Sequence, residues 1–155
     1  MVLPLHLLKK YQESCSFYST TVSKIQQEVL REFIRGVYFG RHLNKMRGIY
    51  KNKHDFLVSE LKKRPWVENI AGDNAGLHVL VQVNTTLTEE EICKKAAECG
   101  IRLMGIREHY IHTPPEGRPV LLLGYGKPDE QEIQKGLEVL ESIITGRNSN
   151  NCKKP

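Results

Sequence analysis

Arginine and histidine side chains are the first candidates for chemistry in this sequence. Arg41 and His42 are adjacent, and Arg47 follows within two helical turns. A guanidinium group can hold a carboxylate or a phosphate through two parallel hydrogen bonds, so these residues form a candidate anion site. The same residues would also suit the solvated side of a helix, and the sequence leaves both interpretations open.

Two histidines later in the chain raise the question of a metal or proton-transfer site. His109 and His112 lie close to Arg107 and Glu108, and imidazole and carboxylate groups are common metal ligands and bases. Alternation along a strand places His109 on one face, whereas His112 falls in the following loop. We therefore interpret both as polar residues at a strand edge. His78, within an apolar run, is interpreted as a hydrogen-bonded core or interface histidine.

The cysteines and the familiar sequence motifs add no catalytic group. The four cysteines, which contain no CxxC pair, are Cys15, Cys93, Cys99 and Cys152. We interpret them as reduced structural residues that bind no metal. The sequence has no P-loop, no GxGxxG after a strand, no HExxH and no GxSxG. The residues alone therefore identify neither a catalytic residue nor a metal site.

The composition is that of one ordinary globular domain. The chain has 155 residues, 39% hydrophobic and 26% charged, with a formal net charge of +5. Excess positive charge can indicate a nucleic-acid partner, but the basic residues are scattered without an aromatic-interleaved motif, which favours a solvated basic surface. No run reaches the ~18 apolar residues of a membrane helix and no signal peptide is recognisable, so we expect a cytoplasmic protein without a membrane partner.

The first half of the chain has the apolar periodicity of helices. The predicted helices cover residues 1–12, 20–36 and 38–63. A polar loop is predicted over residues 14–19. Gly36 and Pro65 are the expected stops of the second and third helices. The apolar stripe of the third helix requires a substantial partner surface.

The second half mixes strands with helices. The predicted strands cover residues 67–70, 76–84, 101–106 and 120–125. Helices are predicted to begin at Thr88 and Asp129, because each is followed three positions later by a glutamate, as in a capping box. The element order predicts an α+β fold with helices on one face of a small, largely antiparallel sheet. The polar residues 146–155 predict a disordered tail.

Four segments together resemble one protein family, the MocR/GabR-type transcriptional regulators of the GntR family. These segments are VLPLHLLKK (2–10), FIRGVYFGRHLNKMRGIYKNKHDFL (33–57), AGLHVLVQV (75–83) and VLLLGYGKPDEQEIQKGLEVL (120–140). Their order and spacing are similar to the C-terminal small domain of the family's fold-type-I, PLP-dependent aminotransferase-like part. Val37 departs from the pattern, in which a glycine precedes the aromatic and Arg-His residues; here Gly36 comes one residue early.

The resemblance implies that this chain is one part of a larger assembly. Residues 1–35 would be a helical linker from a missing large domain, and residues 36–145 the small domain. PLP would be bound in the intact protein through a lysine outside this chain. No lysine here matches that context, so we assign no catalytic residue, and we expect no cofactor on this chain by itself.

The family resemblance also implies a site for the effector or substrate carboxylate. The aminotransferases carry an arginine on the strand before the last helix, and Leu122 occupies that position here. Arg118 is the nearest substitute, and Arg41 with His42 is a second candidate effector site. A leucine at position 122 disfavours ordinary α-amino-acid transamination and favours effector sensing.

Three functions follow from these observations. The first is a regulator fragment that closes over PLP and an amine or amino-acid effector, works as a homodimer and reaches DNA only through a missing winged-helix domain. The second is the small domain of a genuine class I/II aminotransferase, and the third is a freestanding α+β ligand-binding module. In each case the isolated chain is expected to be inactive. Exposed Leu3, Leu7 and Phe33 predict association through the N-terminal helices.

Overall fold

The computed structural model describes residues 3–15, 22–72, 76–112 and 117–147. The chain divides into two compact units, Met1–Lys45 and Met46–Pro155. Their border lies inside a helix, ten residues after the boundary predicted at residue 35. The assignment of residues 1–35 to a linker and 36–145 to a small domain stays a prediction. The predicted tail falls largely outside the described residues.

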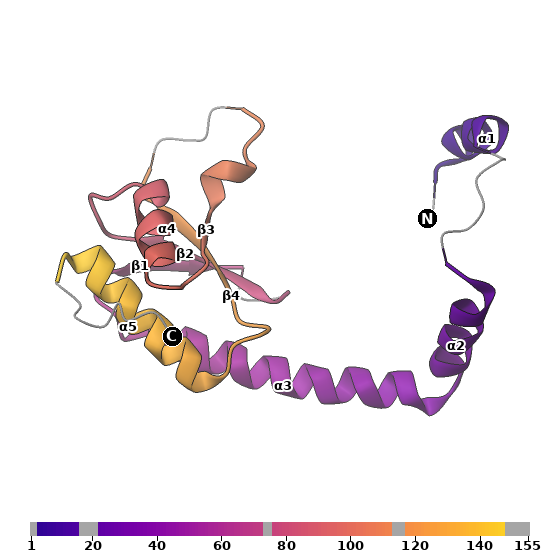
Figure 1. The fold of residues 1–155 in the computed structure, drawn as a ribbon, viewed down its shortest axis with the longest axis horizontal. Coiled ribbons are helices and arrows are strands. Elements are labelled where there is room, and N and C mark those ends of the chain that lie inside the picture. Colours follow the sequence, from indigo (N-terminus) through magenta and orange to yellow (C-terminus); the bar gives the residue numbers. More distant parts are fainter. Residues whose placement is uncertain (1–2, 16–21, 73–75, 113–116, 148–155) are drawn as a thin grey trace. The chain divides into compact units, whose positions relative to one another are not determined.

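The first unit is helical, as the periodicity predicts. It contains α1 (Leu5–Ser14), α2 (Lys24–Arg35) and the beginning of α3 (Val37–Lys62) (Figure 1). Helix α2 begins later than predicted because Ser23 caps it: the Ser23 hydroxyl accepts from the Gln26 N–H, and the Gln26 side chain accepts from the Ser23 N–H. Gly36 ends α2 as predicted. Ser14 is helical, so the predicted loop begins too early, and its remainder lies mostly outside the described residues.

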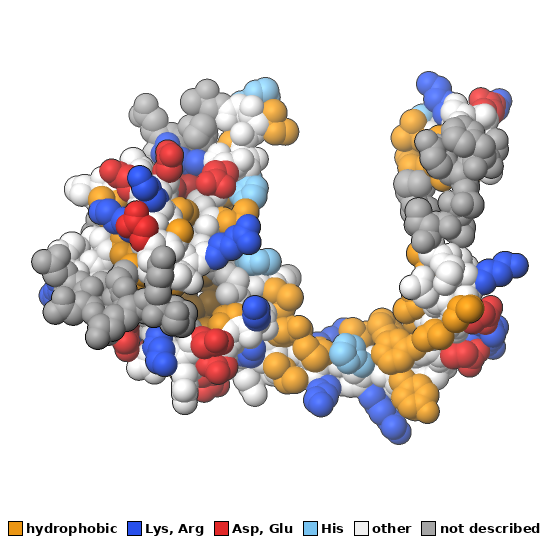
Figure 2. Space-filling view, in the orientation of Figure 1, with side chains coloured by type: hydrophobic (Ala, Val, Ile, Leu, Met, Phe, Trp, Pro, Cys, Tyr) orange, Lys and Arg blue, Asp and Glu red, His pale blue; other side chains and the backbone are white. Residues whose placement is uncertain are grey.

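The surface of α2 and of the beginning of α3 is unusually apolar. Ile25 is 77% exposed and Val29 64%, and Figure 2 shows the hydrophobic side chains gathered on these helices. The predicted exposure of Leu7 and Phe33 is confirmed, whereas Leu3 is half-buried. An exposed apolar surface of this kind is typical of a protein contact.

The second unit is built on an antiparallel sheet. Its strands are β1 (Val67–Ala71), β2 (His78–Val83), β3 (Met104–Gly105) and β4 (Val120–Gly124). The strand order is β1-β2-β4-β3, and every described pair is antiparallel. The predicted α+β class and the largely antiparallel sheet are confirmed.

Three helices cover one face of this sheet: the end of α3, α4 (Glu89–Glu98) and α5 (Glu130–Thr145). Alternate strand residues point into this core, including Val79, Val81, Leu121 and Leu123. The helices contribute Leu57, Leu61, Ile92, Ile133, Leu137, Leu140 and Ile144. We call the sheet surface beneath the helices the closed face and the opposite surface the open face.

Both predicted capping boxes are present, and they set where α4 and α5 begin. The Thr88 hydroxyl accepts from the Glu91 N–H, and the Glu91 carboxylate accepts from the Thr88 N–H at 2.8 Å. The hydrogen bonds from the Thr88 backbone and side chain lower the pKa of Glu91. Asp129 and Glu132 repeat the arrangement at α5.

The strand predicted over residues 101–106 is wrong for most of its length. Only Met104–Gly105 pairs with β4, and a 3₁₀ helix, η1 (Ile106–His109), follows. The Arg107 N–H donates to the Glu89 carboxylate at 2.9 Å instead of to a neighbouring strand. The Glu89 carboxylate of α4 thus accepts the hydrogen bond that a carbonyl of a neighbouring strand would otherwise accept, and the chain turns away from the sheet.

The interpretation of all cysteines as reduced is also wrong. Cys15 and Cys93 are free, but Cys99 is disulfide-bonded. Burial, with smaller contributions from the Glu108 and Glu89 carboxylates, raises the pKa of the Cys93 thiol, so Cys93 is a poor nucleophile near neutral pH.

Candidate functional site

The open face of the sheet is the candidate functional site, because it presents ordered side chains that are not packed into the core. Strand residues alternate between faces, so Leu80 of β2 and Leu122 of β4 lie opposite the buried Val79, Val81, Leu121 and Leu123. Both leucines are half-buried, whereas the neighbouring core residues are almost inaccessible. The same strands therefore supply a packed surface and an available one.

One line of apolar side chains crosses all four strands of the open face. In the strand register Ala71 pairs with Leu80, Leu80 with Leu122, and Leu122 with Met104. Directly opposed antiparallel residues share a face, with Cβ atoms ~5 Å apart. Ala71, Leu80, Leu122 and Met104 therefore form a continuous row, which we call the apolar row. Met104 is 41% exposed and Ala71 is exposed too, so the row is accessible at both ends.

The rows on either side differ in polarity. On one side lie Asn69, Gln82 and Val120, paired in that order across β1, β2 and β4. On the other side His78 pairs with Gly124, and a Cβ added at Gly124 would lie 3.2 Å from Cδ2 of His78. His78 is exposed, which contradicts its interpretation as a core histidine but not as an interface residue.

Arg118, the predicted substitute for the carboxylate-binding arginine, is engaged by a carboxylate of the chain itself. Its Nη1 lies 3.1 Å from Oε2 of Glu68, and both side chains are partly exposed. Glu68 falls at the β1 bulge and has no strand partner in β2. The structure therefore places Arg118 at the end of the sheet, two residues before Val120 and outside the apolar row.

A buried carboxylate beside Arg118 is the polar residue that the sequence did not single out. Glu89 is 6% exposed and accepts hydrogen bonds from the N–H groups of Arg107 (2.9 Å) and Val120 (2.8 Å). Its Oε1 also lies 3.9 Å from Nε of Arg107. Gly105 leaves room for it, since an added Cβ would come within 2.8 Å of the Glu89 Cβ. Glu89 fixes β4 and η1 to the start of α4.

A broad cleft next to Glu89 carries groups of both charges. Its volume is ≈ 1030 Å³, and its walls include Glu89, Glu108, Arg107 and Arg118. The acidic groups offset the arginines and face the same space, so the cleft is not a simple anion site. Its chemistry suits a ligand with balanced charges or water.

Arg41 and His42, the second candidate site, belong to the first unit. The His42 ring packs edge-on against Phe33, with ring centroids 6.3 Å apart. Successive helical residues point ~100° apart, so Arg41 and His42 do not share one helix face. Their role in effector binding stays a prediction.

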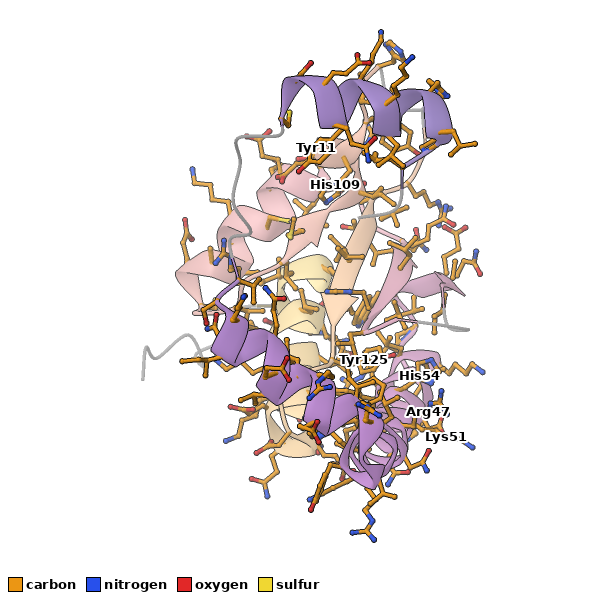
Figure 3. All side chains as sticks on the ribbon, turned by 90° about the vertical axis from the view of Figure 1, so that its right-hand side faces the viewer. Tyr11, Arg47, Lys51, His54, His109 and Tyr125 are labelled. Atoms are coloured by element: carbon orange, nitrogen blue, oxygen red, sulfur yellow. The ribbon has the colours of Figure 1, made fainter. Side chains whose placement is uncertain are left out.

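The part of α3 in the second unit carries a second set of polar groups (Figure 3). Arg47, Lys51 and His54 share one side of α3, and His54 lies against Tyr125 with ring centroids 5.6 Å apart. Burial raises the pKa of Tyr125, whose hydroxyl donates to the Gly76 carbonyl at 2.7 Å. The neutral phenol therefore serves as a fixed hydrogen-bond donor within the fold.

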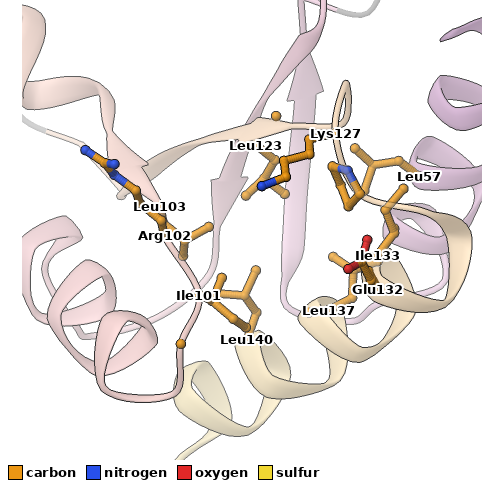
Figure 4. Close-up of a pocket in the computed structure, with 14 residues that line it drawn as sticks. Leu57, Ile101, Arg102, Leu103, Leu123, Lys127, Glu132, Ile133, Leu137 and Leu140 are labelled. Atoms are coloured by element: carbon orange, nitrogen blue, oxygen red, sulfur yellow. The ribbon is translucent and has the colours of Figure 1, made fainter. Parts of the chain in front are cut away.

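A groove opens on the helix-covered side of the sheet (Figure 4). Its volume is ≈ 420 Å³, and Ile101, Leu103 and Leu137 are among its apolar walls, with Lys127 and Glu132 also lining it. This lining suits an apolar group that also carries a polar or charged end.

One lysine beside the sheet, Lys53, is engaged by backbone groups of the chain itself. The open face carries no lysine, and Lys53, from α3, donates to the carbonyl oxygens of Gly126 (3.2 Å) and Lys127 (3.3 Å). A lysine must be free to form a Schiff base with PLP. The assignment of the PLP lysine to a part of the protein outside this chain stays a prediction.

His109 and His112 do not meet in a metal site. His109 ends η1 instead of lying on a strand, and both side chains are exposed. Among the described residues, no group of three or more His, Cys, Asp or Glu side chains is placed to hold a metal ion. No helix in the described ranges is long and apolar enough to cross a membrane.

Comparison with known proteins relates the chain to transcriptional regulators. No protein-family model matches the sequence. The chain is 35% identical over 144 residues to the uncharacterized HTH-type transcriptional regulator YdeL of Bacillus subtilis and 31% identical over 143 residues to YhdI of the same organism. It is 24% identical to the probable rhizopine catabolism regulatory protein MocR of Rhizobium meliloti. The chain spans about 30% of the length of these relatives.

Solved structures with a similar fold are aminotransferases. The multiple substrate aminotransferase of Thermococcus profundus matches 92% of this chain with a TM-score of 0.76 and 17% identity; the match covers 35% of that enzyme. The α-aminoadipate aminotransferase LysN of Thermus thermophilus matches 94% of this chain with a TM-score of 0.75 and 18% identity, and the match covers 37% of LysN. At these identities the likeness establishes the fold.

The two comparisons agree on the kind of molecule. The sequence relatives are HTH-type and MocR regulators, the fold is that of an aminotransferase small domain, and both matches leave about two thirds of the other protein uncovered. The chain therefore matches the C-terminal small domain of the aminotransferase-like part of MocR-type transcriptional regulators of the GntR family.

Proposed function

We propose that this chain closes over an effector in an intact, cytoplasmic aminotransferase-like regulator. The open face carries the proposal: one side of the sheet is fully packed by helices, and the other presents half-buried, ordered side chains. A face of this kind can cover a ligand that the rest of the protein holds. The effector is an amine or an amino acid.

The residues of this chain would bind and shield the effector rather than transform it. Leu80 and Leu122 exclude water from the side of the effector that they cover. Arg118 is the candidate partner for an effector carboxylate, which would have to replace Glu68. Partly exposed ion pairs contribute only ~0–1 kcal/mol, so this exchange costs little. Arg41 and His42 remain candidates for a second effector contact.

The rest of the intact protein supplies the cofactor and the DNA-binding domain that responds to closure. When bound there, PLP supplies the electrophilic carbonyl that recognises a primary amine. Under this proposal residues 36–145 form the small domain, residues 1–35 connect it to the large domain, and closure reaches DNA through a separate winged-helix domain. The exposed surface of α2 then lies against the large domain or against the second subunit of a homodimer.

The deciding experiment is to read the natural gene upstream of the codon for Met1 and to purify its complete product. We expect a winged-helix segment and a cofactor-lysine region in the same frame, a visible PLP absorbance band, and DNA affinity that changes when an amine is added. A PLP-binding product without a DNA-binding segment would favour a genuine aminotransferase. A gene with nothing in frame upstream would leave a freestanding binding module and overturn the proposal.

The association of the chain can be tested directly. Because Ile25, Val29 and Phe33 are exposed, we expect the 155-residue chain to form dimers or larger oligomers as its concentration rises. Light scattering across a range of concentrations measures this. Replacing Ile25 and Val29 by glutamine should shift the chain toward the monomer, whereas a wild-type chain that is monomeric throughout contradicts the expectation.

A further inference from the structure

We propose that the groove shown in Figure 4 binds a small aliphatic carboxylate, with its alkyl chain against the apolar walls and its carboxylate at the Lys127 ammonium. The groove lies within the second unit, on the helix-covered side of the sheet, and the proposal does not depend on the proposed function. The volume of the groove, ≈ 420 Å³, lies within the ~300–1,000 Å³ that small-molecule sites usually have.

The groove opens where strand pairing stops. The ladder between β3 and β4 ends at Met104 and Leu122, so Ile101 and Leu103 lie beyond it. Both of these side chains are half-buried, whereas Leu137, which also lines the groove, is buried. An alkyl chain in the groove would therefore remove the remaining apolar surface of Ile101 and Leu103 from water without displacing the core.

A glycine inside α5 keeps the groove open. Gly136 lines the groove, and a Cβ added to it would meet nothing within 4 Å apart from the backbone of its own helix. Its φ is not positive, so neither packing nor backbone geometry requires glycine at this position. Glycine destabilises a helix interior relative to alanine. The space that Gly136 leaves free is thus available to a ligand at a cost in helix stability.

A cation without a partner lies beside these apolar walls. Figure 4 shows the Lys127 side chain extending over the groove, and among the described residues its ammonium has no hydrogen-bond or ion-pair partner. Arg102 also lines the groove and is exposed and unpaired within the described ranges. Glu132 brings a negative charge, but its carboxylate accepts the Asp129 N–H at 2.9 Å in the capping box of α5. The two cations outnumber this carboxylate, so the groove complements an anion.

The turn that carries Lys127 is held in place by the chain itself. The Lys53 ammonium, from α3, donates to the carbonyl oxygens of Gly126 (3.2 Å) and Lys127 (3.3 Å). The capping box at Asp129 fixes the following residues as the start of α5. Because this backbone is ordered before a ligand arrives, only the Lys127 side chain must lose freedom on binding.

Probes that share one alkyl chain and differ in the head group test the proposal: hexanoate, hexan-1-ol and hexylamine. Methyl NMR of the 155-residue chain at neutral pH measures binding at Ile101, Leu103 and Leu137. We expect hexanoate to perturb these residues at concentrations about tenfold lower than hexylamine does, because the Lys127 ammonium attracts the carboxylate and repels the amine. Hexan-1-ol should fall between the two.

Filling the groove should remove the binding without harming the fold. In Gly136→Leu the new side chain occupies the groove, so we expect hexanoate affinity to fall at least about tenfold, while leucine favours the helix more than glycine does. Gln134→Leu is the matched control, because Gln134 is exposed on α5 and outside the groove. The milder Gly136→Ala should raise the melting temperature by roughly 2–4 °C and weaken binding less.

Removing the cation tests the head group separately. Lys127→Met keeps an unbranched side chain without the charge, so we expect hexanoate to bind about tenfold more weakly and hexan-1-ol to bind as before. Lys135→Met is the matched control, because Lys135 is an exposed lysine of α5 that does not line the groove. Thermal unfolding of each variant checks that it folds.

Each outcome supports or overturns the proposal. Saturable hexanoate binding that is lost in Gly136→Leu and weakened in Lys127→Met supports it. Absence of saturable hexanoate binding overturns it, as does binding that Gly136→Leu leaves unchanged, because the ligand would then lie elsewhere. Tighter binding of hexylamine than of hexanoate would assign the head group to Glu132 and overturn the proposed ligand class.

Discussion

The two faces of the sheet are formed by neighbouring residues of the same strands, but these residues have different surroundings. On the closed face Val79, Val81 and Leu121 are fully buried beneath three helices, and on the open face Leu80 and Leu122 are half-buried. Hydrophobicity is shared by both faces, so it does not distinguish core from site. The difference lies in what covers each face.

Under the proposed function, this contrast separates residues for stability from residues for recognition along a single strand. Adjacent residues of β4 point in opposite directions, so Leu121 contacts the helices while Leu122 completes the apolar row. A substitution can therefore affect one property and leave the other almost unchanged. The substitutions below test that separation.

The largest effect is expected on the closed face. Leu121 is 0% exposed, and Leu121→Ala removes buried methyl groups and leaves a cavity. We expect a loss of about 2–5 kcal/mol in the free energy of unfolding. Urea unfolding of the 155-residue chain, followed by circular dichroism, measures it. A loss below about 1 kcal/mol would mean that the closed face is not the core.

The next effect concerns the buried carboxylate of Glu89 at the start of α4. Gly105→Ala would place a Cβ within 2.8 Å of the Glu89 Cβ, so the carboxylate or η1 must move. We expect a loss of about 1–3 kcal/mol. Combining it with Glu89→Ala should cost less than the sum of the two single changes, because the contacts of the new Cβ with Oε2 and Cδ of Glu89 disappear and only the contact with the Cβ of residue 89 remains. Additive losses would show that the two positions do not interact.

A smaller effect is expected on the open face. Leu122→Ala shortens a half-buried side chain that no helix of the closed face contacts, and we expect the unfolding free energy to change by less than about 1 kcal/mol. The same urea experiment compares it with Leu121→Ala. If Leu122→Ala is as damaging as its neighbour, the open face contributes to the core and the separation fails.

The smallest effect is expected only at acidic pH, in the capping box of α4, which is one of the three helices that cover the closed face. The folded pKa of Glu91 is lowered from 4.5, so its contribution is present above pH ~4.5 and is lost as the pH falls through the folded value. The Glu91→Gln variant should therefore be less stable than the wild type above pH ~4.5, and this difference in unfolding free energy should become smaller as the pH drops below 4.5. Glu90→Gln, in the same turn but outside the capping box, is the control and should show no such trend.

Local signals predicted much of this arrangement. The capping boxes at Thr88 and Asp129 placed the starts of α4 and α5 because each signal lies within four consecutive residues. Apolar runs predicted β2 and β4 in full, with ranges that extend one or two residues beyond the observed ends. The family resemblance, carried by the order of four segments, predicted the regulator relatives and the aminotransferase fold.

The remaining errors share a cause, which is contact between residues far apart in the sequence. Residues 101–106 have the composition of a strand, but Glu89 accepts a hydrogen bond from the Arg107 N–H and redirects the chain after Gly105. Glu89 itself is one of three successive glutamates at a helix start, where exposure is the ordinary expectation. The ion pair of Arg118 with Glu68 could likewise not be predicted from the sequence, because the two residues are far apart in the chain and no local pattern links them.

The bulge at Glu68 has a further consequence for a domain with an exposed apolar sheet face. Sheets with open edges can add strands from other molecules and grow into aggregates. Here one edge, β1, is interrupted by the bulge and carries Glu68, which pairs with Arg118 at the end of the sheet, and the other edge, β3, is two residues long. Neither edge offers a long flat template, so the domain can keep its apolar face available for binding with little risk of edge-to-edge polymerisation.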